Sequence, residues 1–357
     1  MSEGPAEAPR RPRRRVLLDD ADTCIELYVQ PGRSDTVVIT FDPLQQLVEQ
    51  APFGKDFLLR QGVEVLAVRR RHEHFYQALD REAFMEAVAP RLRRYRRVVA
   101  YGSSLGAYAA LYYCRDLRCQ VIASSPRVSV HPVYGVPAWQ QQVGFRHERF
   151  DAARRPTCLA RIFYDPCDPI DRRYVEGEVL PAFASARVYR LPYSGHPSNH
   201  FLSEIGYIAP YVRAVVAGQS TPRLERCRKR DSATYLATLA QACAQRGKPR
   251  TAEALLGRAL ILRPRSALAW RVRGLNAILQ GDEAAARAAL ARALELSPGD
   301  QLSRHWLDTL PAQVARARRP GGPTAMTDAT SRPPPLPALS RLGIAFERIA
   351  GALGRGR

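Results

Sequence analysis

The fold is decided by the stretch Arg97-Val-Val-Ala-Tyr-Gly-Ser-Ser-Leu-Gly-Ala-Tyr-Ala-Ala-Leu-Tyr-Tyr113. Its apolar start predicts a buried strand, the Gly/Ser run predicts a sharp turn, and Ala, Leu and Tyr at helical spacing predict a helix. The turn is Gly102-Ser103-Ser104-Leu105-Gly106, a G-x-S-x-G pattern that is typical of a serine held on a strained strand-to-helix turn. We expect a side chain at Gly102 or Gly106 to collide with a neighbouring strand or helix.

This placement makes Ser104 the candidate nucleophile. Its hydroxyl would stand above the strand ends, near the N-terminus of the following helix, where the N–H of Leu105 can stabilise a developing oxyanion. The alternative is an ordinary strand-to-helix turn that is capped by Ser103.

Apolar runs alternate with helical stretches on both sides of this turn. The alternation predicts an α/β fold with a mainly parallel sheet and helices on both faces. The first two strands are expected to form a hairpin. The predicted strands are 23–29, 36–41, 63–68, the run starting at Arg97, 120–124, 159–164 and 187–191, and the predicted helices before the turn are about 56–60 and 81–95.

A serine nucleophile needs a base, and the base needs a carboxylate that holds its tautomer. The segment Asp165-Pro-Cys-Asp-Pro-Ile-Asp171 follows a predicted strand, and we choose Asp168 as the acid, with Asp165 and then Asp171 as alternates. Turn or cap roles explain these aspartates equally well. His196, in a Gly-His step after the next strand, is the expected base, and His200 is its competitor.

The other histidines are expected at the surface or in substrate contacts. His72 and His74 lie beside an Arg run, and His131 and His147 lie in a long segment without a clear period, between the strands ending near Ser124 and starting near Cys158. We interpret this segment as a lid or substrate-pocket insertion. A partly disordered surface loop is the alternative.

With these motifs in place, residues 16–218 resemble the α/β-hydrolase superfamily, whose triad follows the chain order serine, acid, histidine; Ser104, Asp168 and His196 match that order. The resemblance implies attack by Ser104 assisted by His196. Residues 101–111 also resemble bacterial hydrolase-like proteins linked to surface-polysaccharide acyl transfer, which implies a small-molecule or glycan ester as substrate. No cofactor is implied.

The loop after the strand 36–41 departs from the lipase-like pattern, because Phe41-Asp-Pro-Leu-Gln replaces a glycine run. Pro43 has no N–H, so the second oxyanion donor must be Phe41, Asp42 or Leu44, and we assign it to Asp42. An acidic side chain beside an oxyanion is unfavourable unless it points away.

The second half of the chain contains a repeat of 34 residues. Gly247, Ala252, Leu256, Ala259 and Pro264 recur as Gly281, Ala286, Leu290, Ala293 and Pro298. Small residues where two helices touch, and a proline where the second ends, are typical of stacked helical hairpins. The pattern resembles the tetratricopeptide repeat, with a module over 231–310 that includes a capping helix at 302–310. Such modules bind protein partners; a purely structural appendage is the alternative.

The formal net charge is +20, but the ends of the chain, 1–15 and 311–357, contribute nine of these charges. We expect both ends to be disordered. The segment 339–353 can be drawn as an amphipathic basic helix, which would allow contact with an anionic membrane. Nucleic-acid binding is not expected, because no recognition motif accompanies the arginines; the runs 69–71 and 91–97 are its only candidates.

Seven cysteines without C-x-x-C spacing favour reduced thiols in the cytoplasm over a disulfide framework, and no metal site is expected. The sequence thus predicts a cytoplasmic serine hydrolase or acyltransferase with a repeat module. A catalytically inactive hydrolase-fold scaffold is the alternative.

Overall fold

The computed structural model describes residues 12–319. The chain divides into two compact units. The sheet unit contains the chain up to Ser129 together with Phe145–Arg226, and the helical unit contains Val130–Gly144 together with the chain from Cys227 onward. The expectations for residues 1–11 and 320–357, among them the terminal membrane-binding helix, lie outside the described residues.

The sheet unit is built on an eight-stranded sheet with the order β1-β2-β4-β3-β5-β6-β7-β8 over the described residues. From β4 to β8 all neighbours are parallel, whereas β1 and β2 pair antiparallel with their neighbours. The central strands are buried on both faces, as their continuous apolar runs require. The strands are β1 Arg13–Asp19, β2 Thr23–Val29, β3 Thr36–Phe41, β4 Glu64–Arg70, β5 Arg97–Ser103, β6 Gln120–Ser124, β7 Leu159–Tyr164 and β8 Arg187–Arg190.

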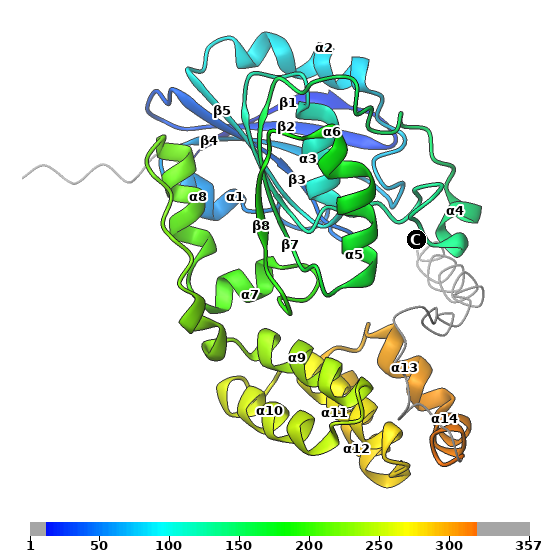
Figure 1. Ribbon diagram of the computed structural model, residues 1–357. Helices are drawn as coiled ribbons and strands as arrows, with labels where there is room; N and C mark the ends of the chain where they lie inside the picture. The colour runs from blue at the N-terminus through cyan, green and yellow to red at the C-terminus, as the bar shows by residue number, and fades with distance from the viewer. Residues whose placement is uncertain (1–11, 320–357) are drawn as a thin grey trace, which may run out of the picture. The chain divides into compact units, whose positions relative to one another are not determined.

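Helices cover both faces of this sheet (Figure 1). Figure 1 shows α1 and α8 on one face and α2, α3, α5 and α6 on the other. A single π-helical turn, Val175–Val179, joins α5 to α6. The helices are α1 Lys55–Leu59, α2 Arg81–Leu92, α3 Leu105–Cys114, α5 Pro169–Tyr174, α6 Leu180–Ala182, α7 Asn199–Glu204 and α8 Ile208–Ala217.

An aromatic cluster holds α2 and α3 on the sheet. Phe41 of β3 stacks on Tyr113 of α3 with ring centroids 5.8 Å apart, and Phe84 of α2 lies 4.8 Å from the same tyrosine ring. All three side chains are fully buried. Since α3 follows β5 directly, this cluster also fixes the height of the β5–α3 turn above the sheet.

Two local expectations for the sheet unit were wrong. The first two predicted strands do not form a hairpin: β2 pairs with β1 and β4, and β3 pairs with β4 and β5. The expected disordered tail 1–15 overlaps β1, because Arg13–Arg15 pair with Leu27–Val29. This edge strand has only three apolar residues out of seven, and they are consecutive, so no alternation marks it in the sequence.

The helical unit reproduces the period of the sequence repeat. α9 and α11 begin at Ala233 and Ala267, and α10 and α12 begin at Pro249 and Glu283, so each helix recurs after 34 residues. Assignment to the tetratricopeptide family stays a prediction. The helices are α4 Pro137–Gln142, α9 Ala233–Gln245, α10 Pro249–Leu262, α11 Ala267–Leu279, α12 Glu283–Leu296, α13 Gln301–Asp308 and α14 Leu310–Ala317.

Small residues occur where these helices touch, as expected. A Cβ on Gly274 would lie 2.7 Å from the Leu290 side chain, so α11 and α12 approach each other too closely for a larger residue. The module extends further than expected, because α14 continues to Ala317, seven residues into the predicted tail, and buries Leu310 and Val314.

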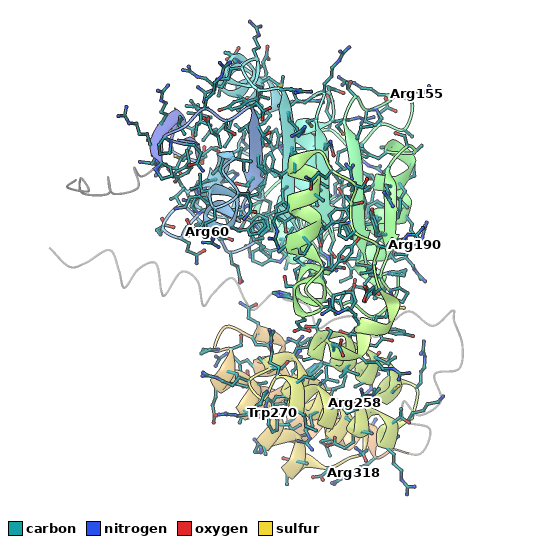
Figure 2. The ribbon with its side chains drawn as sticks, turned by 90° about the vertical axis from the view of Figure 1, so that its left-hand side faces the viewer. Arg60, Arg155, Arg190, Arg258, Trp270 and Arg318 are labelled. Carbon is teal, nitrogen blue, oxygen red and sulfur yellow. The ribbon has the colours of Figure 1, made fainter. Side chains whose placement is uncertain are left out.

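The arginines are distributed over both units. Figure 2 labels Arg60, Arg155 and Arg190 on the sheet unit and Arg258 on the helical unit, and all four are exposed. Arg69 and Arg70, by contrast, are buried among carboxylate and carbonyl oxygens. They therefore cannot offer their guanidinium groups to a phosphate. Among the described residues, no helix combines the length and the apolar character that a membrane span requires.

Candidate active site

The turn between β5 and α3, residues 102–106, is termed the elbow. Ser104 is its central residue, with φ 55° and ψ −119°, a conformation that costs an L-residue roughly 1–3 kcal/mol. Ser104 precedes the first residue of α3, and its side chain makes no capping bond, so the turn is not the ordinary Ser103-capped one. Its N–H donates to the carbonyl of Ser124 on β6 (2.8 Å), which holds the strained residue against the neighbouring strand.

The two glycines of the elbow are required by close backbone contacts. A Cβ on Gly106 would lie 2.2 Å from the carbonyl oxygen of Phe41 on β3, and a Cβ on Gly102 would lie 2.1 Å from the carbonyl oxygen of Gly106. No real Cβ approaches backbone so closely. The expected collision with a neighbouring strand and helix is therefore present at both positions.

A chain of hydrogen bonds leads from Ser104 into the protein. The Ser104 Oγ lies 2.8 Å from Nε2 of His196, and Nδ1 of His196 lies 3.0 Å from Oδ2 of Asp171. The imidazole comes from the loop between β8 and α7, and the carboxylate from the first turn of α5. His200, the competing histidine, is exposed on α7, where it is not the imidazole that Ser104 contacts.

The carboxylate that contacts His196 is Asp171 and not Asp168, which corrects the expected acid. Asp168 is the N-cap of α5, and its side chain accepts the N–H groups of Ile170 (3.0 Å) and Asp171 (2.8 Å). Its Oδ1 also lies 2.9 Å from Nη2 of Arg127. Because Asp168 caps α5, its side chain points toward the helix backbone. The first turn of α5 then directs the side chain of Asp171, three residues later, toward the imidazole.

Asp165, the other alternate acid, binds the backbone of the loop that carries His196. Its buried carboxylate accepts backbone N–H groups from Cys167 (2.8 Å), Tyr193 (2.9 Å) and Gly195 (2.9 Å). Burial raises the pKa of Asp165, although these three N–H groups oppose the rise. Asp165 therefore fixes the backbone immediately before His196, while a different aspartate contacts the ring.

A second anchor follows His196 in the sequence. The Ser198 N–H donates to the Oγ of Ser125 (3.1 Å), and the hydroxyl of Ser198 lies 2.8 Å from that of Ser194. All three serines are fully buried. Together with the Asp165 contacts, they hold the loop on both sides of the imidazole.

Asp171 is a buried ion that is well compensated. Its side chain has no exposure, and burial alone would raise its pKa; the contacts with His196 and Arg127 outweigh burial and lower the pKa below the ordinary value. The carboxylate is thus ionised at neutral pH. An ionised acceptor on Nδ1 keeps Nε2 free to accept a proton from Ser104.

The expected oxyanion residues lie close to this site. Leu105 is the first residue of α3, so its N–H is one of those at the helix start that have no partner within the helix. The side chain of Asp42 is held elsewhere: its Oδ2 accepts from Nε of Arg69 (2.8 Å) and its Oδ1 from the N–H of Phe53 (2.8 Å). Both carboxylate oxygens are engaged, so the side chain does not compete for the oxyanion position.

Three histidines expected at the surface are buried: His74, His131 and His147. His147 stacks on Tyr112 (ring centroids 4.0 Å apart, 2° between planes) and its Nδ1 lies 2.7 Å from the hydroxyl of Tyr108. Burial lowers the pKa of His147 to about 4 and that of His74 also to about 4. The aromatic neighbours that bury His147 come from α3, which is distant from it in the sequence.

The segment interpreted as a lid is divided between the two units. Its first part, Val130–Gly144 with α4, belongs to the helical unit, whereas the part from Phe145 onward, including His147, belongs to the sheet unit. The role of Val130–Gly144 as a lid stays a prediction.

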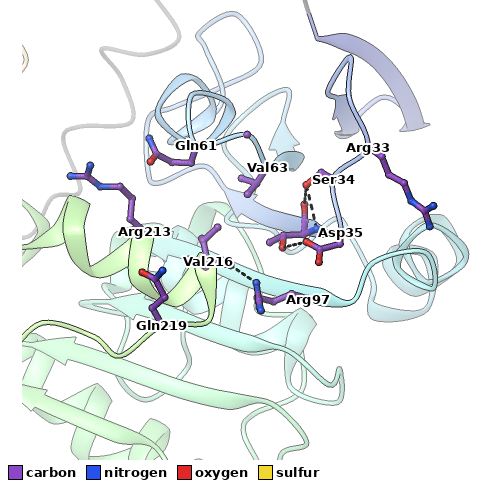
Figure 3. A pocket seen from close by; sticks show the side chains of 12 residues that line it. Arg33, Ser34, Asp35, Gln61, Val63, Arg97, Arg213, Val216 and Gln219 are labelled. Atoms are coloured by element: carbon purple, nitrogen blue, oxygen red, sulfur yellow. Dashed lines mark hydrogen bonds between the residues drawn. The ribbon is translucent and has the colours of Figure 1, made fainter.

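A cavity of about 630 Å³ lies at the other end of the sheet, where β3 and β5 begin (Figure 3). Its lining includes Arg33, Arg97 and Arg213. Nη1 of Arg97 donates to the carbonyl of Val216 (3.1 Å) in the last turn of α8, as Figure 3 shows. This arginine caps a helix C-terminus, and the cavity is separate from the Ser104 site.

A mostly parallel eight-stranded sheet with flanking helices fits the α/β-hydrolase fold, and the serine on its strand-to-helix turn fits the same class. Among solved structures, the chain is similar to a dienelactone hydrolase from Anabaena variabilis (14% identity, 59% of this chain and 99% of that one, TM-score 0.39) and to an esterase from Pyrococcus furiosus (14% identity, 58% and 92%, TM-score 0.39). It is also similar to a thioesterase domain from the curacin biosynthetic pathway (11% identity, 58% and 100%, TM-score 0.35).

A scan against protein-family models finds no match, and a search of curated proteins finds no match either. The identities and TM-scores of the similar structures are too low to transfer an activity to this chain. Its function is therefore argued from its own side-chain geometry.

Proposed function

We propose that the chain is a serine-dependent hydrolase or acyltransferase that acts on an ester-type substrate through Ser104, His196 and Asp171. The observation that carries this proposal is the pair of hydrogen bonds of 2.8 Å and 3.0 Å that joins the three side chains in the order nucleophile, base, acid. The strained φ of Ser104 supports it further, since strain in a turn persists only where the surrounding contacts impose it.

In the proposed reaction, the Ser104 Oγ attacks the carbonyl carbon of the ester while Nε2 of His196 accepts the hydroxyl proton. Asp171 stabilises the imidazolium that forms, and the Leu105 N–H, at the positive end of α3, donates to the oxyanion. Collapse of the tetrahedral intermediate breaks the bond to the leaving alcohol, which takes the proton from His196. Water or an acceptor hydroxyl then attacks the acyl-enzyme by the same route.

A fluorophosphonate probe tests this proposal, because it labels only a serine whose proton a base can remove. We expect the wild-type protein to be labelled, and Ser104→Ala and His196→Ala to lose labelling. Ser103→Ala, at the last residue of β5 and directly before Ser104, is the matched control and should keep labelling. Equal labelling of the wild type and Ser104→Ala would refute the proposal.

The second candidate function is a hydrolase-fold binding protein without turnover. The observation that favours it is Pro43, which has no N–H and leaves the second oxyanion donor to the backbone of Phe41, Asp42 or Leu44. This candidate predicts that Ser104 is labelled slowly or not at all, and that no ester from a panel of acyl chain lengths is turned over.

For the helical unit we infer a protein-binding role of the tetratricopeptide kind. The recurrence of α9–α10 as α11–α12 after 34 residues supports it. A cytoplasmic location is also part of the proposal, and it is supported by seven cysteines that show no C-x-x-C spacing. Capture of partners by the full chain, compared with a chain ending at residue 226, tests the role of this unit.

A further inference from the structure

We propose that Arg127 is a positioning residue of the Ser104 site, which fixes Asp171 in the orientation from which it reaches His196. The inference rests on the proposed function. The guanidinium approaches one oxygen of the carboxylate only: Nε lies 2.9 Å and Nη2 lies 2.5 Å from Oδ1 of Asp171. Nδ1 of His196 lies 3.0 Å from Oδ2 and also 3.0 Å from Oδ1, so the imidazole faces both oxygens of the carboxylate. The guanidinium thereby holds Oδ1, one of the two oxygens that face the imidazole.

Arg127 is itself held by a second carboxylate. Its Nη2 lies 2.9 Å from Oδ1 of Asp168, whose position is fixed by the backbone N–H groups that it caps. The backbone of Asp171 is one of those N–H donors. Asp168 therefore holds the main chain of Asp171 and one end of the arginine, and the arginine holds the side chain.

The contacts with Arg127 are needed because the side chain of Asp171 is fully buried. Without Arg127, the buried, ionised carboxylate would lose both guanidinium contacts and the positive charge that compensates it, which is strongly destabilising. The like charge of Asp168 would also be uncompensated. We expect Asp171 to turn toward a new donor or to take up a proton, and either change weakens its bond to His196.

The same residue also contacts the elbow, but through its backbone. The N–H of Arg127 donates to the carbonyl of Ser104 (3.2 Å). A substitution of the side chain keeps this backbone bond and removes only the guanidinium contacts. The expected defect is thus confined to the acid, and the elbow and its strained serine stay in place.

The test uses the full chain with Arg127→Met and Arg127→Lys. Arg172→Met is the matched control, because Arg172 follows Asp171 directly, carries the same charge and is exposed. We measure the rate of fluorophosphonate labelling and, independently of activity, the low-field proton signal of the His196 Nδ1–H that is hydrogen-bonded to a carboxylate. Thermal unfolding shows which variants fold.

We expect Arg127→Met to fold, to lose or shift the low-field signal, and to be labelled about 100-fold more slowly. Arg127→Lys, which keeps the charge and one donor, should fall between this variant and the wild type, and Arg172→Met should stay within about twofold of the wild type. A folded Arg127→Met that keeps both the signal and the labelling rate overturns the inference.

If Arg127→Met does not fold, Arg127→Lys decides by the same two readouts, and wild-type values in that variant would overturn the inference. If the wild type itself is not labelled, the proposed function fails, but the low-field signal still tests whether Arg127 orients Asp171. Loss of that signal in a folded variant would then support the positioning role without the reaction.

Discussion

The elbow and the acid loop, residues 165–171, lie at the same edge of the sheet but are determined in different ways. In the elbow, two glycines stand where a Cβ would lie 2.1–2.2 Å from backbone atoms, so the residue types follow from the path of the chain itself. In the acid loop, three aspartates of equal chemistry make three different sets of contacts: backbone N–H groups for Asp165, a helix end and Arg127 for Asp168, and the imidazole together with Arg127 for Asp171.

The difference teaches which parts of a site are local. A strained turn imposes residue types at fixed offsets, and such offsets can be recognised along the chain. A carboxylate that must reach a histidine from another loop has no such offset. The partner of His196 depends on where α5 begins, and therefore on which aspartate caps it.

The largest effect should come from the acid loop. We expect Asp171→Asn to lower kcat/KM for an ester substrate by about 10³–10⁴-fold, because an amide cannot stabilise the imidazolium and holds Nδ1 in the wrong tautomer. Steady-state kinetics with a chromogenic ester measures it. A loss of this size in Asp168→Asn, with Asp171→Asn unaffected, would instead show that Asp168 is the acid, as the sequence predicted.

In the elbow, Gly106→Ala should destabilise the sheet unit by about 3–5 kcal/mol, because its Cβ would collide with the carbonyl of Phe41 and backbone must move. Denaturant unfolding measures it. Gly257→Ala in α10 is the matched control: no atom lies within 4 Å of its Cβ, and alanine should stabilise the helix by about 0.5–1 kcal/mol. Similar values for the two variants would contradict the close approach at the elbow.

The two regions should also differ in pH dependence. His147 packs against α3, the helix of the elbow, and its pKa is lowered from 6.5 to about 4. Between pH 6.5 and pH 4, His147 binds a proton in the unfolded chain but not in the folded protein. The free energy of unfolding should therefore fall by about 3 kcal/mol as the pH drops from 6.5 to 4. His74 adds in the same direction.

Asp171, in the acid loop, has a pKa below its ordinary value of 3.8, so its contribution is present above that pH and is lost as the pH falls through the lower folded value. The free energy of unfolding in urea, measured at pH 7 and at pH 5, reports the histidine contribution, because the contribution of Asp171 is lost only at lower pH. His147→Gln should reduce the difference between these pH values, and the exposed His72→Gln should not. An unchanged difference in His147→Gln would argue against a buried neutral imidazole.

The smallest effect is expected for Asp168→Asn. Asparagine caps a helix as well as aspartate does, so α5 should keep its start, and only the ion pair with Arg127 is weakened. We expect a loss of about 1 kcal/mol or less in unfolding free energy and at most about a tenfold loss in kcat/KM. A larger loss in activity than in stability would indicate that Asp168 acts on the site through Arg127.

Much of the architecture was accessible from sequence. The apolar runs correspond to strands β2 to β8, and the helical stretches correspond to α1, α2 and α3. The edge strand β1 was missed because three of its seven residues are arginine and its pairing partner lies in β2. The burial of His74, His131 and His147 was also missed. The rings that cover His147 come from a helix about 35 residues earlier in the chain, so its burial has no local signal.

By itself, the sequence determined the strand-to-helix turn, the serine at its centre and the period of the helical repeat, because residue types at fixed offsets along the chain mark each of them. The tertiary structure alone decided that Asp171 and not Asp168 faces His196, and that Arg127 contacts the same carboxylate. These are contacts between loops that follow different strands. Their geometry is set by how the strands pair and where α5 is capped, and no spacing along the chain encodes it.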